Sequence, residues 1–302
     1  MTRPIVCVVN RRAGSVREMT EQQITDAIHK AAADAGGEPP KVELSSPETI
    51  RDALADARTR ADEVWVGGGD GTLKTATELF LETDTTLGVL PLGTMNLLAR
   101  DLGIPLDLSE AVAAISQAPI GPISIGRVNG EPFLTMSALG LYPEMVIDRE
   151  RRRRLFGYGK WAAMARAAYR ALRRHRTMHV RITADGEVRD VETTALIVTA
   201  AAFRFRAGRL FDRPALDSDT LTVYISHPKS RFGAVEQVAR VFLGSVERDP
   251  ELETMEAREV RIDFEKSRPV ANDGEVDFVR APLVYELGAT KLKVRYPALS
   301  QP

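Results

Sequence analysis

The first third of the chain alternates short apolar runs with longer stretches of helical periodicity. Four apolar runs predict buried strands: residues 4–9, 41–44, 64–66 and 86–90. A helix is predicted from about residue 16 to Gly36-Gly37, and another opens at Ser46-Pro47, a capping serine before a proline at the first helical position. This alternation predicts an α/β domain with a mostly parallel, doubly wound sheet and ligands at the carboxyl ends of its strands.

After about residue 122 the pattern changes to period two. Asn129-Gly130 and Asp185-Gly186 are strong signals for two-residue hairpin turns. Further strands are predicted at residues 123–128, 132–137, 179–183, 195–199, 221–226, 260–264, 284–287 and 292–296. We therefore expect two domains, an α/β domain at 1–122 and a β-rich domain at 123–302, the second an antiparallel sandwich or partly closed sheet.

Charge and apolar runs limit where the protein works. The 302 residues include 41 Lys+Arg and 42 Asp+Glu, so any basic surface must be local. The N-terminal apolar run is too short for a signal-peptide core, and no segment approaches the roughly 18 apolar residues of a membrane span. The lone cysteine, Cys7, is expected to be a buried core thiol, which fits a reducing compartment. We expect a cytoplasmic protein unless it attaches to a membrane surface.

The stretch VGGGDGTLK, residues 66–74, joins a predicted strand to a predicted helix. Its glycines let the backbone approach a phosphate closely, and the start of the helix offers free N–H groups. Asp70 would repel a bare phosphate, but it suits the site if Mg²⁺ lies between them. Neither GxGxxG nor Walker A fits, because Thr72 replaces the third glycine and Lys74 is out of position. The alternative is a tight turn with an aspartate helix cap.

A second loop, LPLGTMNLLAR at residues 90–100, repeats this design. Gly93 allows a tight turn, and Thr94 and Asn96 supply a hydroxyl and an amide at a new helix start. The pair of loops, GGGDGT followed by PLGTMN, resembles the diacylglycerol kinase catalytic-domain family of lipid kinases. That family also includes the sphingosine and ceramide kinases, and it is more distantly similar to the NAD kinases.

Two stretches of the second half strengthen the resemblance. Residues 272–275, Asn-Asp-Gly-Glu, resemble the family's Asp-Gly-Glu motif, which implies that Asp273 accepts the proton of the acceptor hydroxyl and Glu275 supports it. Read alone, Asp273-Gly274 predicts a hairpin turn, and both roles are compatible. Residues 214–221 resemble a family segment that holds a structural Mg²⁺. By position its ligands are the Asp219 carboxylate and the backbone carbonyls of Leu216 and Leu221, with Thr220 replacing the family's glycine.

The resemblance covers nearly the whole chain and implies an active site in a cleft between the two domains, with the last strand returning to the first domain. It implies that the first domain binds ATP, with Asp70 also holding the catalytic Mg²⁺. The implied nucleotide-binding residues are Asn10, Ser45, Gly67, Gly68, Gly69, Asp70, Gly71, Thr72, Gly93, Thr94 and Asn96. Ser46 is the alternative to Ser45 at its position.

The implied activity is ATP- and Mg²⁺-dependent transfer of the γ-phosphate to a lipid hydroxyl, with Asp273, Glu275 and Asp70 as catalytic residues. Many diacylglycerol kinases have an aspartate where this chain has Leu97, and sphingosine-kinase-like members lack an acid there. Leu97 therefore weakens diacylglycerol as the acceptor and favours a ceramide or sphingoid lipid. A NAD kinase and a catalytically silent lipid-binding relative are the alternatives, the latter because Leu97 and Thr220 are altered.

Residues 149–176 carry eleven Lys or Arg and a single acid, Glu150. Trp161 and Tyr169 fall on one helical face and arginines on the other, which is typical of a helix at an anionic bilayer surface. This predicts a peripheral protein at the inner membrane face. The alternative is a helix packed on the β domain with a solvated basic face. No groove-reading motif supports nucleic-acid binding, and a homodimer through an exposed β edge is left open.

Overall fold

The computed structural model describes residues 4–144, 146–147, 177–206, 209–213, 215–227 and 251–297. The predicted basic helix at 149–176 lies outside the described residues. The chain forms two compact units: Met1–Ile125 with Ala289–Pro302 is the first unit, and Gly126–Gly288 is the second unit.

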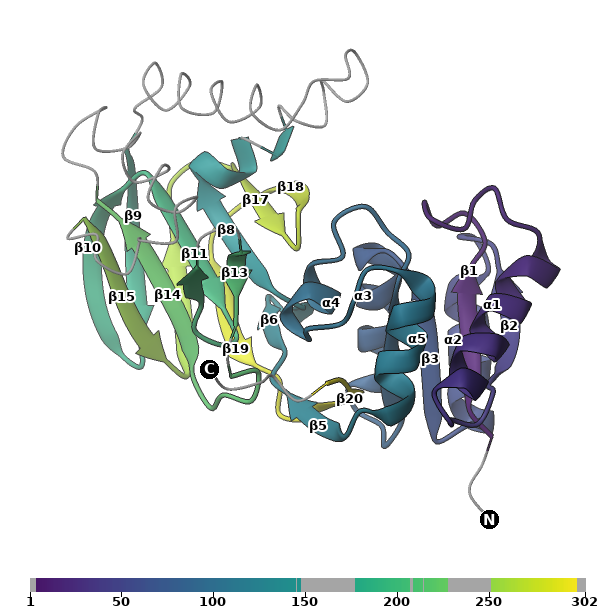
Figure 1. The fold of residues 1–302 in the computed structure, drawn as a ribbon. Coiled ribbons are helices and arrows are strands. Elements are labelled where there is room, and N and C mark those ends of the chain that lie inside the picture. The colour runs from purple at the N-terminus through teal and green to yellow at the C-terminus, as the bar shows by residue number, and fades with distance from the viewer. Residues whose placement is uncertain are drawn as a thin grey trace. The chain divides into compact units, whose positions relative to one another are not determined.

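The first unit is built on one six-stranded sheet (Figure 1). In spatial order its strands are β2 (Lys41–Ser45), β1 (Val6–Asn10), β3 (Glu63–Gly68), β4 (Thr86–Pro91), β20 (Leu292–Arg295) and β5 (Ile120–Ile123). The first five run parallel, and β5 pairs antiparallel with β20. The sheet therefore incorporates a strand from the far end of the chain, between β4 and β5.

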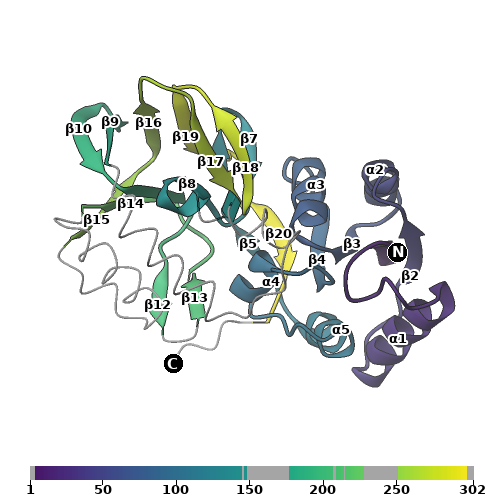
Figure 2. The same ribbon diagram turned by 90° about the horizontal axis from the view of Figure 1, so that it is seen from above.

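Helices cover both faces of this sheet. α1 (Glu21–Asp34) packs beside α5 (Leu108–Gln117), and α2 (Ile50–Arg60) packs beside α3 (Asp70–Phe80) on the opposite face (Figure 2). A short helix, α4 (Leu97–Asp101), follows β4. The buried residues of α1, Ile24, Ile28, Ala31 and Ala32, recur at helical spacing, which is why this segment packs as an amphipathic helix.

Two helices begin later than their sequence patterns predicted. α1 begins at Glu21, because Thr20 and Gln23 form a capping box that satisfies N–H groups at the helix start, and the chain before it is in turns. α2 begins at Ile50, because the Ser46 carbonyl accepts a hydrogen bond from Thr49 N in a turn that precedes the helix. Ser46 is therefore in a turn and is not the cap of α2.

The second unit contains two six-stranded antiparallel sheets. One has the order β10-β9-β16-β19-β6-β7, and the other β15-β14-β11-β8-β17-β18. Their bounds are β6 (Gly126–Val128), β7 (Glu131–Phe133), β8 (Met136–Gly140), β9 (Met178–Ala184), β10 (Glu187–Thr193), β11 (Ala195–Thr199), β14 (Leu221–Ser226), β15 (Leu252–Ala257), β16 (Glu259–Asp263), β17 (Arg268–Asn272), β18 (Glu275–Val279) and β19 (Leu283–Leu287). A separate hairpin joins β12 (Arg204–Arg206) to β13 (Arg209–Asp212).

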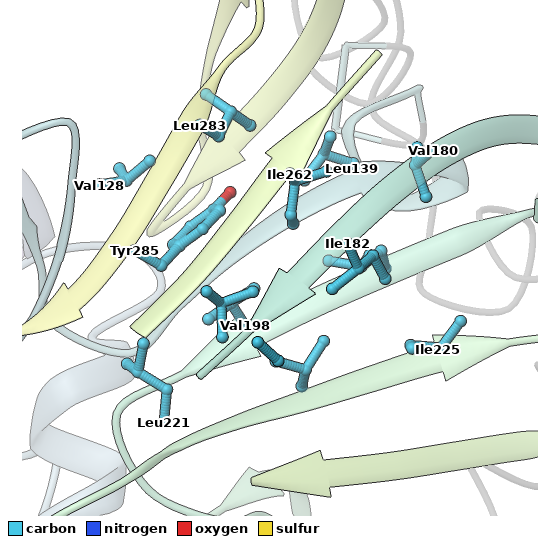
Figure 3. Packing of buried hydrophobic residues seen from close by; sticks show 14 of the residues in the cluster. Val128, Leu139, Val180, Ile182, Val198, Leu221, Ile225, Ile262, Leu283 and Tyr285 are labelled. Carbon is cyan, nitrogen blue, oxygen red and sulfur yellow. The ribbon is translucent and has the colours of Figure 1, made fainter. Parts of the chain in front are cut away.

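Apolar side chains from both sheets form the core of the second unit (Figure 3). Burial alternates along β9, where Met178, Val180, Ile182 and Ala184 are buried and the residues between them are more exposed. Tyr285 is fully buried, and its hydroxyl lies 3.0 Å from Ser137 Oγ, so its polar end has a partner inside the core. The predicted fold class, a mostly parallel α/β domain followed by an antiparallel β-sandwich, is confirmed.

Hairpins set the order of strands in the second unit. Asn129-Gly130 joins β6 to β7, and Asp185-Gly186 joins β9 to β10. All four residues have positive φ, as a type I′ turn requires, so both sequence predictions are confirmed. The predicted strand at 123–128 is instead two strands in different sheets, β5 ending at Ile123 and β6 starting at Gly126, because the chain passes from the first unit to the second there.

Two further expectations concern burial. Cys7 lies in β1 with no exposed surface, and this burial raises the pKa of its thiol, so it is the core thiol that the sequence predicted. Among the helices of the described ranges, none is long and apolar enough to cross a membrane.

Candidate functional site

Three loops meet at the carboxyl edge of the parallel sheet in the first unit. They follow β1, β3 and β4, and the order β2-β1-β3-β4 makes the gap between β1 and β3 a topological switch point, where ligands bind in open α/β sheets. Asn10 Nδ2, at the end of β1, donates to Thr72 Oγ1 in the glycine loop over 3.1 Å. Two of the residues predicted to bind a nucleotide are thus joined across the switch point.

The glycine loop and the second loop approach each other backbone to backbone. A Cβ atom on Gly93 would lie 2.4 Å from Gly69 Cα, so neither loop could sit where it does with a larger residue at Gly93. Leu92 N also donates to the Gly68 carbonyl over 3.0 Å. These glycines therefore allow the two loops to pack closely. This role is additional to the close approach of a phosphate, which the sequence analysis predicted for them.

α3 begins directly on the glycine loop. Its N-cap is Gly69, which has no side chain to cap the helix, and Asp70 is its first residue. The amide groups of the first turn of an α-helix have no partner within the helix and carry the positive end of its dipole. An anion could bind here, beside Gly71, which is exposed.

Asp70 joins the glycine loop to the second loop. Its Oδ1 accepts a hydrogen bond from Leu97 N over 2.7 Å, and its Oδ2 accepts one from Asn96 N over 3.0 Å. The carboxylate therefore caps the start of α4 and not that of its own helix. A carboxylate is also a ligand of the kind that binds Mg²⁺ or its waters.

Asn96 organises the second loop from inside. It is buried and adopts left-handed backbone angles, with φ of 51°. Its Oδ1 accepts a hydrogen bond from Gly93 N over 2.8 Å, and its Nδ2 donates to the carbonyls of Pro91 and Gly93. The Asn96 amide is thus used within the loop, whereas Thr94 is exposed and can reach a ligand.

Ser45 ends β2 beside these loops. Its hydroxyl lies 2.8 Å from Thr49 Oγ1, and its carbonyl accepts a hydrogen bond from Arg11 N. Nearby, Arg12 forms an exposed ion pair with Glu48. A hydrogen bond from Ser46, aided by Arg12, holds the pKa of the Glu48 carboxyl below its usual range. Hydroxyl groups and an ion pair therefore line the loop after β2.

Asp273 lies in the second unit, at a hairpin turn. Asp273 and Gly274 have φ of 51° and 88° and join β17 to β18, so the hairpin reading of this dipeptide is also correct. The Asp273 carboxylate is buried and accepts hydrogen bonds from the backbone N–H groups of Leu134, Thr135 and Met136 and from the Thr135 hydroxyl. Glu275, the first residue of β18, is exposed.

The predicted structural Mg²⁺ ligands lie before and at the start of β14. Leu216 is buried, Asp219 is exposed, and Leu221 is the first residue of the strand. Within the described ranges, no group of three or more His, Cys, Asp or Glu residues could hold a metal ion. The predicted Mg²⁺ site differs from such a group, because its ligands are one carboxylate and two backbone carbonyls, and residues 216–221 contain all three.

The predicted site residues therefore fall into two sets. Asn10, Ser45, the glycine loop and the second loop belong to the first unit, and Asp273, Glu275 and residues 216–221 belong to the second. Sequence reasoning missed Thr135, whose hydroxyl donates to Asp273, and the buried Arg213, which donates to the Leu134 carbonyl. Nothing in the local sequence marks either residue, because their partners are more than seventy positions away.

The fold and its loops define a class of proteins in which an α/β domain with two glycine-containing loops precedes a β-sandwich. Residues 4–128 match the model of the diacylglycerol kinase catalytic domain. Residues 148–295 match the model of the YegS C-terminal NAD kinase beta sandwich-like domain. The first of these matches is to the family that the two loops indicated.

Individual relatives agree with this assignment. The chain is 35% identical over 121 residues to a probable lipid kinase YegS-like of Pseudomonas savastanoi pv. phaseolicola, a match covering 31% of this chain and 39% of the relative. It is 38% identical over 90 residues to the diacylglycerol kinase of Bacillus subtilis, covering 29% and 30%. The matched part thus spans less than half of these curated relatives.

The structural similarity to known proteins covers more of the chain than these sequence matches do. A putative diacylglycerol kinase from Bacillus anthracis str. Sterne, whose crystal structure is known, superposes with a TM-score of 0.75 over 97% of each chain at 22% identity. The likeness at this identity concerns the fold alone, and it includes both units.

Proposed function

We propose that this protein is a lipid kinase that transfers the γ-phosphate of ATP to a lipid hydroxyl in a Mg²⁺-dependent reaction. The observation that carries the proposal is the pair of loops at the carboxyl edge of the first sheet, held together by the Asp70 carboxylate. The match of residues 4–128 to the diacylglycerol kinase catalytic domain supports both ATP as the phosphate donor and a lipid as the acceptor.

Phosphoryl transfer requires positioning and neutralisation of charge more than covalent chemistry. In the proposed mechanism, the backbone of residues 67–72 and the Thr94 hydroxyl hold the phosphates of ATP, with Asn10 and Ser45 contacting the nucleotide. Asp70, which the amides of the second loop fix in place, would hold Mg²⁺ directly or through its waters. The bound ion would neutralise charge on the phosphate oxygens.

Asp273 is proposed as the base that accepts the proton of the lipid hydroxyl as the hydroxyl oxygen attacks the γ-phosphorus. Glu275 is proposed to support it. A second, structural Mg²⁺ is proposed at the Asp219 carboxylate and the carbonyl oxygens of Leu216 and Leu221. Residues 149–176 are proposed to contact an anionic membrane surface, which would bring the protein to its substrate at the inner face.

The lipid acceptor is proposed to be a ceramide or sphingoid lipid, with diacylglycerol as the second candidate. Leu97 supports this order because it brings no acid to the second loop, and its backbone N–H is the group that Asp70 holds. Phosphorylation of NAD is the rival activity within related folds, and lipid binding without catalysis is the rival outside enzymes.

The first test uses purified protein with radiolabelled ATP and Mg²⁺. Mixed micelles carrying diacylglycerol, ceramide or sphingosine are offered as acceptors, and soluble NAD is offered in parallel. Labelled lipid is the expected product, and its identity names the acceptor. Labelled NAD without labelled lipid would replace the proposal with the NAD kinase reading, and Mg²⁺-dependent ATP binding without any product would favour the silent relative.

Asp273→Asn tests the base. It should abolish lipid labelling while ATP affinity stays close to that of the wild type, because Asp273 is not among the nucleotide-binding groups. Asparagine also turns an NH₂ group toward a backbone N–H, so the structural cost of the change needs a matched control. Asp185→Asn supplies it, since Asp185 occupies the same turn position and accepts hydrogen bonds from the backbone N–H groups of Arg258 and Glu259.

The two variants are compared for labelling rate and thermal stability. Asp185→Asn should retain activity, whether or not the change lowers the thermal stability. Full activity in Asp273→Asn would remove Asp273 as the base. Equal loss of activity in both variants would assign the effect to the turn.

A further inference from the structure

The carboxylate of Asp273 is surrounded by hydrogen-bond donors from Leu134, Thr135 and Met136, which together form a cradle. Oδ1 accepts three hydrogen bonds, from Thr135 N at 2.7 Å, from Thr135 Oγ1 at 2.8 Å and from Met136 N at 3.3 Å. Among the described residues, Oδ2 accepts one, from Leu134 N at 2.8 Å. The two oxygens are therefore unequal: Oδ1 is saturated, and Oδ2 has a lone pair to spare.

The cradle is braced from behind by buried side chains. Arg213 Nη2 donates over 2.8 Å to the carbonyl of Leu134, which is the other end of the peptide group whose N–H meets Oδ1. Arg213 is only 1% exposed. The peptide of Leu134 and Thr135 thus links a buried guanidinium to a buried carboxylate, and hydrogen bonds in such a chain polarise and strengthen one another.

A second peptide group is braced in the same manner. Thr199 Oγ1 lies 2.9 Å from the Thr135 carbonyl, and the N–H at the other end of that peptide belongs to Met136 and meets Oδ1. The same hydroxyl also lies 2.9 Å from the Ala201 carbonyl, so it divides its proton between two acceptors. Arg213 is the stronger of the two braces because its donor carries a full charge.

The other hairpin aspartate shows what a turn alone needs. Asp185 also accepts backbone N–H groups of a neighbouring strand, but its side chain is exposed and receives no side-chain donor among the described residues. Asp273 adds burial, a hydroxyl donor and a braced peptide to the same turn. These additions fix the direction of the carboxylate more tightly than a hairpin requires.

We infer that Thr135 and Arg213 are positioning residues for Asp273, and that Oδ2 is the oxygen that receives the proton from the acceptor hydroxyl. The inference rests on the proposed kinase function. As the hydroxyl oxygen forms its bond to the γ-phosphorus, the bond from that phosphorus to the bridging oxygen breaks, and ADP leaves. The hydroxyl proton passes to Oδ2, because the three donors on Oδ1 occupy that oxygen.

Thr135→Val tests the inference, since it removes the hydroxyl while keeping the shape of the side chain. We expect kcat for lipid phosphorylation to fall by about tenfold or more, the loss typical of one hydrogen bond to a charged group, with KM for ATP within about twofold. Thr135→Ser restores the hydroxyl and should recover kcat to within about threefold of the wild type.

Thr193→Val is the matched control. Thr193 is fully buried in the same unit, and its hydroxyl also donates to backbone carbonyls, those of Ala195 and Ser226, but not to a carboxylate. It should change thermal stability without changing kcat. Equal kcat losses in Thr135→Val and Thr193→Val, or a Thr135→Val enzyme with wild-type kcat, would overturn the inference.

A second readout separates this inference from the proposed function. Amide hydrogen exchange at Leu134, Thr135 and Met136 should be faster in Thr135→Val than in the wild type and unchanged in Thr193→Val, whatever reaction the protein catalyses. Unchanged exchange at these three amides would contradict the positioning role of Thr135. If the wild-type protein labels no lipid but exchange in Thr135→Val changes as expected, the proposed lipid kinase activity is wrong and the positioning of Asp273 by Thr135 still holds.

Discussion

At the residue scale, single carboxylates hold together segments that are distant in sequence. The Asp70 carboxylate accepts hydrogen bonds from backbone N–H groups 26 and 27 positions away in the sequence. The Asp273 carboxylate accepts them from N–H groups more than 130 positions away. Each is also a residue that the sequence selected for chemistry. Mutating either one is therefore expected to change the structure as well as the proposed chemistry, and the two effects need separate measurements.

Asp70→Asn should lower the free energy of unfolding by about 1–3 kcal/mol in the absence of ATP and Mg²⁺, because an NH₂ group would then face the N–H of Asn96 or Leu97. Urea unfolding of the ligand-free protein with a chelator measures this. Asp107→Asn is the control: Asp107 caps α5 by accepting from Ser109 N and Glu110 N, and asparagine caps helices about as well. Unchanged stability in Asp70→Asn would show that this link contributes nothing without metal.

At the element scale, an ion pair ties β20 to β3 in the first sheet. The Arg295 guanidinium meets both oxygens of Glu63 on β3 at 2.7 Å, and its Nη1 donates to the Ala118 carbonyl before β5. Glu63 also accepts the Trp65 indole N–H. The Glu63 side chain is 11% exposed, so these partners take the place of water around its oxygens.

Arg295→Met should destabilise the protein by about 2–4 kcal/mol, because it leaves the Glu63 carboxylate largely buried with one partner lost. Lys293→Met, on the same strand, is the control. Lys293 pairs with Asp84, whose side chain is 98% exposed, so the loss of this pair should destabilise the protein much less than the loss of Arg295. Denaturant unfolding compares the two, and similar small losses would show that Arg295 does not hold β20 in place.

At the scale of the whole molecule, the residues proposed for one reaction come from two compact units that the chain enters and leaves in turn. The groups proposed for ATP and Mg²⁺ lie in the first unit, and the proposed base lies in the second. Ligand binding to the first unit is therefore measurable without turnover, and it tests the nucleotide site by itself.

ATP with Mg²⁺ should raise the melting temperature, since a ligand that binds only the native state stabilises it by about 2.7 kcal/mol at a hundredfold excess over Kd. A chelator should remove most of this shift, because the proposed site holds the phosphates together with the ion. Differential scanning calorimetry with ATP alone, Mg²⁺ alone and both provides the comparison. Equal shifts with and without Mg²⁺ would contradict a metal-assisted site.

Local features of the structure were predictable from the sequence because neighbouring residues determine them. The turns at Asn129-Gly130 and Asp185-Gly186 need positive φ, which these residue types tolerate. The glycine loop was found because glycines between a strand and a helix have few other uses. The start of α1 was misplaced because turns before Thr20 continue the apolar pattern of the helix, with Val16 buried.

The fold class, the hairpins and the two glycine loops can be predicted from the chain alone, since periodicity, turn chemistry and the loop motifs are properties of short segments. The hydrogen-bond partners of the polar groups emerge only in the folded molecule. The Asn96 amide bonds within its own loop, and the Asp70 carboxylate accepts amides of the second loop. Thr135 donates to Asp273, and Arg213 donates to the neighbouring Leu134 carbonyl. Burial makes these partners necessary, because a buried polar group must be hydrogen-bonded. Which partner it receives depends on segments that meet only when the chain has folded.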